Sequence, residues 1–155
     1  VSFGCKTLDG FFGNKATNFF RNPFSTRPWQ HVLEPLRGYL DLAQNLYLNG
    51  CEFGSAWNFG PNEDDVKTVE WVVKEAEKNL PELKYLIDDD ISFHEASYLK
   101  LNSNKAWHYL DWKSLLASED VIDQTCKWYK AFFEKKDMRS YTLNEICNYE
   151  NLLGI

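Results

Sequence analysis

Apolar residues recur at helical spacing over a long stretch of this chain. Between residues 32 and 47 they fall at Val32, Leu33, Leu36, Leu40, Ala43, Leu46 and Tyr47. Proline is tolerated only in the first turn of a helix, so Pro35 places the start near Leu33 or Glu34, and Gly50 is well placed to end the helix. We expect the apolar face to be buried and the polar face, with Glu34 and Arg37, to meet solvent.

Four further helices are predicted later in the chain. The first carries Val69, Val72, Val73 and Ala76 inward and stops before Pro81. Ser103 is the expected N-cap of a short helix through Tyr109, and Ser118 that of a longer one burying Val121, Ile122, Cys126, Tyr129 and Phe133. Thr142 and Glu145 have capping-box spacing for a last helix over residues 143–151.

Short apolar runs predict strands over residues 17–21, 55–59, 84–87 and 97–101. A short helix or turn is expected around residues 8–13, and two X-Pro pairs at residues 22–23 and 27–28 predict a loop. The sequence therefore predicts a helix-rich α/β fold with short strands. Its 155 residues are enough for one compact unit over 1–155 but tight for two domains.

The composition of the chain argues against several classes of function. A net charge of −6 argues against binding to a nucleic-acid backbone, which needs clustered Lys and Arg. No run approaches the roughly 20 apolar residues that cross a bilayer, so we expect no membrane partner. Four scattered cysteines lack zinc-site spacing and indicate buried, reduced thiols in a cytoplasmic protein without a metal site.

Arg27 is the most specific candidate for a ligand-binding residue. It lies in an aromatic, proline-containing loop just before a predicted helix. A guanidinium offers a planar fork to a phosphate, and a helix N-terminus favours the same anion. The other interpretation is a surface arginine stacked on Trp29, and the residues alone leave both open.

Four more polar residues are candidates. Gln30 and His31 share the loop of Arg27, although a histidine beside a helix start is more often a structural hydrogen-bonding residue than a catalyst. Asn58 sits at the end of a predicted apolar strand, where it either faces a ligand crevice or stabilises the turn at residues 60–61. His94 and Glu95 precede a predicted strand and point to opposite sides, so one of them can face the site.

A series of ordered blocks resembles the C-terminal part of the CDP-glucose 4,6-dehydratases, a branch of the extended short-chain dehydrogenase/reductase family. The blocks are residues 21–23, 27–36, 57–61, 69–73, 94–96, 98–101, 103–106, 137–139 and 142–143. The resemblance runs from about residue 8 to about residue 150, which is the C-terminal two-fifths or so of such an enzyme. It implies the fold of the substrate-binding portion, without the N-terminal Rossmann half.

The resemblance also implies residue roles. In the wider family the residues matching Arg27 and Asn58 contact the nucleotide diphosphate or base region. Gln30, His31 and His94 are assigned to substrate binding because they belong to the pattern of the CDP-glucose branch. The family uses NAD to oxidise the sugar at C4, eliminate water across C5 and C6 and return the hydride to C6, which gives a 4-keto-6-deoxy sugar nucleotide.

Several family motifs are missing from this chain. Gly10 and Gly13 are not framed as a dinucleotide-binding loop, and Tyr109 and Lys113 match the Tyr-x-x-x-Lys spacing at a frequency expected by chance. Tyr109 and Lys113 also flank residues 110–112, which match a turn in the family's C-terminal pattern. Asp111 stands where the family usually has a glycine in that turn. We therefore assign no catalytic or cofactor-binding residue, and expect no activity and no bound NAD from these 155 residues alone.

The main expectation is thus a CDP-glucose-binding portion of a dehydratase-like lyase that forms CDP-4-keto-6-deoxyglucose. The alternative is a free-standing, non-catalytic nucleotide-sugar-binding or structural protein. Expected partners are CDP-glucose or a related nucleotide sugar, together with a second copy of the chain or an NAD-binding half.

Overall fold

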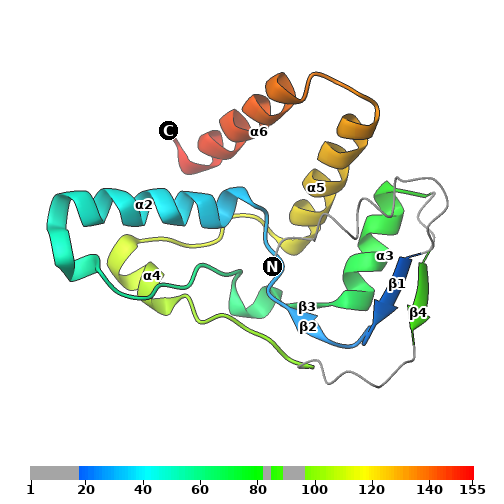
Figure 1. Cartoon of the computed structure of the whole chain (residues 1–155), viewed down its shortest axis with the longest axis horizontal. Coiled ribbons are helices and arrows are strands. Elements are labelled where there is room, and N and C mark those ends of the chain that lie inside the picture. The colour runs from blue at the N-terminus through cyan, green and yellow to red at the C-terminus, as the bar shows by residue number, and fades with distance from the viewer. Residues whose placement is uncertain (1–17, 82–84, 89–96) are drawn as a thin grey trace.

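A computed structural model describes residues 18–81, 85–88 and 97–155, and these form a helix-rich α/β arrangement with short strands, as predicted (Figure 1). The predicted segment around residues 8–13 and the candidate His94 lie outside the described residues. In chain order the elements are β1 (Asn18–Arg21), β2 (Thr26–Arg27), α2 (Leu33–Asn49), the 3-10 turns η1 (Gly50–Phe53) and η2 (Glu63–Asp65), β3 (Lys67–Thr68), α3 (Val69–Asn79), β4 (Tyr85–Asp88), α4 (Asn104–Leu110), α5 (Ser118–Phe133) and α6 (Met138–Leu153).

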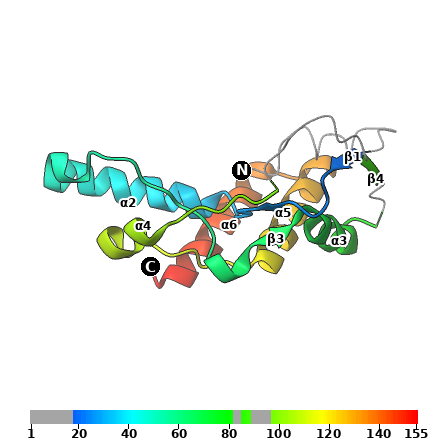
Figure 2. The ribbon, with the colours of Figure 1, turned by 90° about the horizontal axis from the view of Figure 1, so that it is seen from below.

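The helices form two groups joined by α5. At one end α3 lies beside the paired strands β1 and β4, and at the other α2 lies alongside α4 (Figures 1 and 2). Helix α5 packs against both α3 and α6. In both views α2 extends away from α3, so much of its length is not covered by other helices.

The larger core lies between α3, α5 and α6. It contains Val72, Val73 and Ala76 of α3, Val121, Ile122 and Cys126 of α5, and Tyr149 of α6. A smaller core lies under α2, where Phe59 meets Trp112 edge to face with ring centroids 5.0 Å apart. Cys126 is buried as predicted, whereas Cys51 and Cys147 are exposed, and all three are free thiols.

The strands form two small pairs. β1 pairs with β4 in parallel and β2 with β3 antiparallel, and a single bridge joins Thr26 to Tyr98. Over the described residues the strands predicted at 17–21 and 84–87 are confirmed as β1 and β4. The segment 97–101 keeps only the single bridge, and the strand predicted over 55–59 is wrong. The backbone at the end of that segment is bonded by side chains instead of by a neighbouring strand. Gln30 Nε2 donates to the Phe59 carbonyl (2.9 Å), and Ser103 Oγ accepts from the Gly60 N–H (2.8 Å).

Helix α2 is confirmed, but its predicted orientation is wrong. The buried residues are Glu34 and Gly38, whereas Leu40 is 72% and Tyr47 89% exposed. Gly38 explains the choice of face, because a Cβ there would lie 2.4 Å from Cδ1 of Phe59, so only glycine lets that ring lie against the helix. The face left uncovered, here named the α2 stripe, consists of Val32, Leu36, Tyr39, Leu40, Leu46 and Tyr47.

Glu34 is fully buried because its carboxylate is satisfied from two other segments. Oε1 accepts from the backbone N–H groups of Leu115 and Leu116, both at 2.8 Å, and Oε2 accepts from the Tyr149 hydroxyl at 2.7 Å. The Trp112 indole donates to the Glu34 carbonyl at 3.2 Å. A charged group can be buried when all its partners are supplied in this way, and Glu34 thereby fastens α2 to α6.

Two predicted helix caps are wrong and one is confirmed in position only. Ser103 is the N-cap residue of α4 as predicted, but its Oγ accepts from the Gly60 N–H and makes no capping bond. Ser118 is the first residue of α5 rather than its cap. The cap of α5 comes from Asp65, distant in sequence, whose Oδ2 accepts from the Ser118 N–H at 2.7 Å. Helix α6 begins earlier than predicted, at Met138, because Asp137 caps it by accepting from the backbone of Arg139 and Ser140.

Candidate functional site

Arg27 lies in a strand that is held on both sides. Thr26 pairs with Thr68 across the antiparallel β2–β3 ladder, and on its other side its N–H donates to the Ser97 carbonyl at 3.0 Å. The Thr26 carbonyl in turn accepts from the Leu99 N–H at 3.3 Å. Arg27 is half-buried, and its Nη1 donates to the Thr26 carbonyl at 2.8 Å, which anchors the guanidinium at this junction.

The segment that carries Asn58 is tied to the same region. Asn58 is exposed, and its Nδ2 lies 3.4 Å from the carbonyl oxygen of Asn102. The neighbouring Phe59 carbonyl accepts from Gln30, three residues after Arg27. Hydrogen bonds therefore join three segments, residues 26–30, 58–60 and 97–103, which we name the β2 edge. It contains the predicted site residues Arg27, Gln30 and Asn58.

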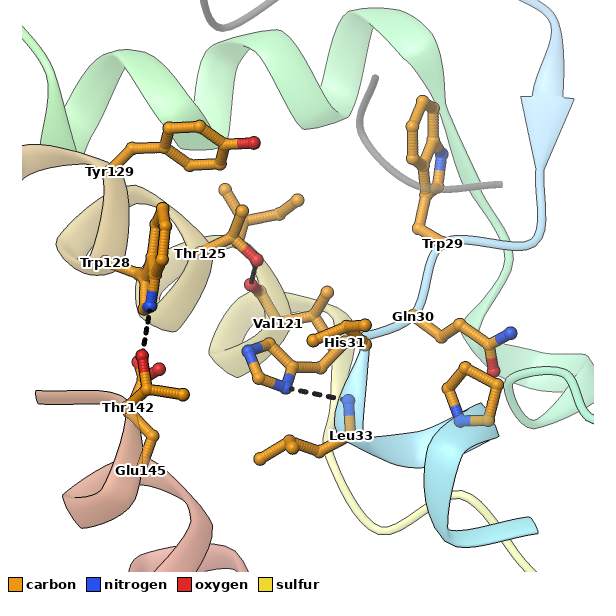
Figure 3. Close-up of a pocket in the computed structure, with 13 residues that line it drawn as sticks. Trp29, Gln30, His31, Leu33, Val121, Thr125, Trp128, Tyr129, Thr142 and Glu145 are labelled. Atoms are coloured by element: carbon orange, nitrogen blue, oxygen red, sulfur yellow. Dashed lines mark hydrogen bonds between the residues drawn. The ribbon is translucent and has the colours of Figure 1, made fainter. Parts of the chain in front are cut away.

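His31 is separated from these residues. It is only 5% exposed, and its Nδ1 accepts from the Leu33 N–H at 3.4 Å. Burial lowers its pKa, so the neutral imidazole is favoured. Figure 3 shows the His31 ring turned towards α5 and α6, whereas the amide of Gln30 points the other way. The structure therefore does not bring His31 together with Arg27 and Asn58.

The His31 ring faces a cleft of about 410 Å³ between the start of α2 and helices α5 and α6, named here the α5–α6 cleft (Figure 3). Its lining residues are Trp29, Gln30, His31, Val32, Leu33, Pro35, Val121, Ile122, Thr125, Trp128, Tyr129, Thr142 and Glu145. The Trp128 indole donates to Thr142 Oγ1 at 3.0 Å, which joins α5 to α6 along the cleft.

Glu145 is the acidic group of the cleft. Burial raises the pKa of its carboxyl to about 7, so it changes charge near neutrality. The sequence pattern predicted Glu145 as part of a helix cap and indicated no role for Trp128. Periodicity places both residues on helices, but only the packing of α5 against α6 shows that they share a cavity.

The glycines of the described residues lie inside α2 (Gly38), at helix or turn ends (Gly50, Gly54 and Gly154) or in the loop before η2 (Gly60). None of them lies in a strand-to-helix turn of the kind that takes a pyrophosphate. Within these same residues no cluster of His, Cys, Asp and Glu could hold a metal ion. None of their helices is long and apolar enough to cross a membrane.

Comparison with known proteins agrees with the resemblance found in the sequence. No family model matches the chain. The chain is 42% identical over 139 residues to the CDP-glucose 4,6-dehydratase of Salmonella typhimurium, which is 89% of this chain and 39% of that protein. The match falls in the C-terminal part of the relative, so the chain spans about two-fifths of its length.

A solved structure shares the fold. It is the dTDP-glucose 4,6-dehydratase of Bacillus anthracis in complex with NAD, with a TM-score of 0.56 and 19% identity. The superposed region covers 84% of this chain and 39% of that one. The predicted fold class, a helix-rich α/β unit that has the fold of one part of such an enzyme, is thereby confirmed.

Proposed function

We propose that this chain, which is related in sequence to the CDP-glucose 4,6-dehydratases, is the nucleotide-sugar-binding portion of such a lyase. The observation that carries the proposal is the 42% identity over 139 residues, which span 89% of the chain. The substrate is accordingly CDP-glucose or a related nucleotide sugar, and the reaction of the assembled enzyme is removal of water to give CDP-4-keto-6-deoxyglucose.

The β2 edge supports this role. Arg27 brings a guanidinium to a strand that is hydrogen-bonded on both sides, which limits the entropy lost when it clamps a diphosphate. Asn58 sits on an adjacent exposed segment and offers an amide with both donor and acceptor atoms. In this proposal Arg27 binds phosphate oxygens, Asn58 orients the nucleotide, and Gln30 acts indirectly by holding the Phe59 carbonyl.

The chemical step belongs to another part of the enzyme. NAD supplies the hydride acceptor in the family, and the described residues lack a site for it, so we assign no catalytic role to this chain. We propose that the α2 stripe is where the NAD-binding half docks. Two observations support this occupant: the stripe is apolar and uncovered, and the Salmonella relative has more than half its length outside the matched region.

Calorimetry on the purified chain tests the binding role. CDP-glucose and CDP should bind saturably at concentrations up to about a millimolar, with UDP-glucose as the comparison for the base. Arg27→Ala should weaken CDP binding by about tenfold or more, because a charge-assisted hydrogen bond to phosphate is lost. Arg139→Ala removes the same charge from an exposed position on α6 and should change nothing.

Two results contradict the proposal. One is no heat of binding for any of the three nucleotides up to about a millimolar. The other is equal affinity in the wild type and Arg27→Ala, which contradicts the role given to Arg27. Absence of binding would leave a non-catalytic structural protein as the better description.

A further inference from the structure

The α5–α6 cleft shares only the loop residues Trp29 and Gln30 with the β2 edge. Gln30 and His31 are adjacent in one loop, yet Gln30 donates to Phe59 while the His31 ring turns into the cleft (Figure 3). The rest of the cleft comes from α5, α6 and the start of α2, which carry none of the residues assigned to the nucleotide sugar. Its role is therefore a separate question from the function proposed above.

The walls of the cleft suit a flat ring. Trp128 is held in place by its bond to Thr142, and Tyr129 stands at 75° to it with ring centroids 5.2 Å apart. Val121 and Ile122 of α5 add apolar surface. A volume of about 410 Å³ lies in the usual range for small-molecule sites, and aromatic walls favour a planar ligand by stacking.

The polar groups of the cleft face one another across it. Since His31 Nδ1 accepts from the Leu33 N–H, the proton of the neutral ring lies on Nε2, which becomes a hydrogen-bond donor. Thr142 and Glu145 lie on the side opposite the His31 ring (Figure 3). No arginine or lysine is among the lining residues, so a phosphate or other anion has no counter-charge there.

We propose that the α5–α6 cleft binds a small, uncharged aminoheterocycle, whose ring nitrogen accepts from His31 Nε2–H and whose amino group donates to the Glu145 carboxylate. The ring lies against Trp128. An amino group is preferred to a second carbonyl because a carboxylate can only accept hydrogen bonds. The same complementarity excludes carboxylate ligands, which would repel Glu145.

Binding is linked to pH through Glu145. A donor from the ligand stabilises the ionised carboxylate, so affinity rises as pH passes through about 7 and levels off above it. Besides His31, the other titratable groups near Glu145 are Asp123 and Lys127 of α5, paired at 2.6 Å, and Tyr141 and Tyr149 of α6. Hydrogen bonding to Asp123 raises the pKa of Lys127, and burial raises that of Tyr141, so both keep their protons near neutrality.

A titration with 2-aminopyrimidine, which stays uncharged near neutral pH, tests the proposal. The readout is the indole N–H resonance of Trp128, assigned by its loss in Trp128→Phe. At about pH 8 the resonance should shift saturably, and affinity should fall several-fold at about pH 6 because most Glu145 is then protonated. Glu145→Gln should bind about tenfold more weakly at about pH 8 and lose the pH dependence. Glu150→Gln, on the exposed side of α6, is the matched control.

Three outcomes overturn the proposal. They are no saturable shift at millimolar probe, equal affinity in Glu145→Gln and the wild type, and displacement of the probe by CDP-glucose, which would make the cleft part of the nucleotide-sugar site. If Glu145→Gln does not fold, the wild-type chain still tests the proposal. An affinity for 2-aminopyrimidine that stays constant between about pH 6 and 8 contradicts a contact with Glu145. Probe binding and CDP-glucose binding are measured separately, so failure of one leaves the other intact.

Discussion

At the scale of single residues, the most constrained group is the Glu34 carboxylate. It accepts three hydrogen bonds from donors that lie 81, 82 and 115 residues further along the chain. The sequence pattern assigned Glu34 to the solvent face because a carboxylate at helical spacing is normally exposed. Its donors are two backbone N–H groups and one tyrosine, and none carries a local signal that points to Glu34.

Tyr149→Phe tests this network. The substitution removes the hydroxyl that donates to Glu34 Oε2 and leaves one buried carboxylate oxygen without that donor. We expect the free energy of unfolding to fall by about 1–3 kcal/mol, measured by urea denaturation. Tyr47→Phe, at an 89% exposed position, should change stability by less than about 0.5 kcal/mol. Equal effects of the two substitutions would show that the Glu34 bond contributes nothing.

Glu145 gives a pH-dependent prediction. Its pKa is about 7 in the folded chain against an ordinary 4.5, so the folded state binds more protons between these values. The contribution of this residue to stability therefore falls as pH rises through that window and is constant above it. Denaturation of the wild type at about pH 5 and about pH 8 should show a larger loss than the same pair of measurements on Glu145→Gln.

Glu150→Gln should keep the wild-type pH dependence, since Glu150 is exposed. Parallel pH curves for the wild type and Glu145→Gln would mean that Glu145 titrates near its ordinary pKa.

The elements themselves were predictable where a regular pattern extends over several turns. The helix with Val72, Val73 and Ala76 inward is found as expected, and so is the 17-residue α2. The orientation of α2 was not predictable, because the uncovered face is the more apolar one and the packed face is selected by Gly38. Sequence periodicity locates a helix, but it does not tell which face of the helix packs against the rest of the chain.

Gly38→Ala tests what selects the packed face. A Cβ there would overlap the Phe59 ring, which is itself held against Trp112. Alanine improves helix propensity by about 1 kcal/mol, but overpacking costs about 1–3 kcal/mol, so we expect a net loss of up to about 2 kcal/mol in urea denaturation. Gln44→Ala on the exposed side of α2 is the control and should be neutral or slightly stabilising. A gain from Gly38→Ala would contradict the packing described here.

Asp65→Ala tests the distant cap of α5. It removes the acceptor of the Ser118 N–H and also the 3.3 Å ion pair with Lys67. A lost cap costs about 1 kcal/mol, within a range of about 0.5–2, and thermal or urea unfolding would measure it. The adjacent exposed Asp64→Ala should have little effect. If both substitutions cost the same, the capping geometry is unimportant.

At the scale of the whole molecule, the predicted site residues lie in two different places, which could not be predicted from the sequence. Arg27, Gln30 and Asn58 were expected together and are joined through the β2 edge. His31 was expected with them but lines the α5–α6 cleft, because consecutive side chains of one extended loop point in different directions. The family resemblance supplied the candidate residues, and the fold shows which of them lie close together.

The α2 stripe leads to a prediction about association. An uncovered apolar face of this length should make the isolated chain self-associate as its concentration rises, which ultracentrifugation would detect. Leu40→Glu places a charge in the stripe and should return the chain towards a monomer. Asn144→Glu adds the same charge at an exposed position on α6 and should leave association unchanged. A wild type that stays monomeric at high concentration would contradict the role given to the stripe.

The bond between Tyr149 and Glu34 also has a consequence for the order of events during synthesis. The ribosome makes α2 before α6, and the hydroxyl that completes the Glu34 carboxylate arrives 115 residues later. Long-range closure of this kind is slow, and N-terminal segments emerge first. Glu34 therefore stays incompletely paired on the nascent chain until Tyr149 has been made, and the region where α2 meets α6 becomes native only after α6 has left the exit tunnel.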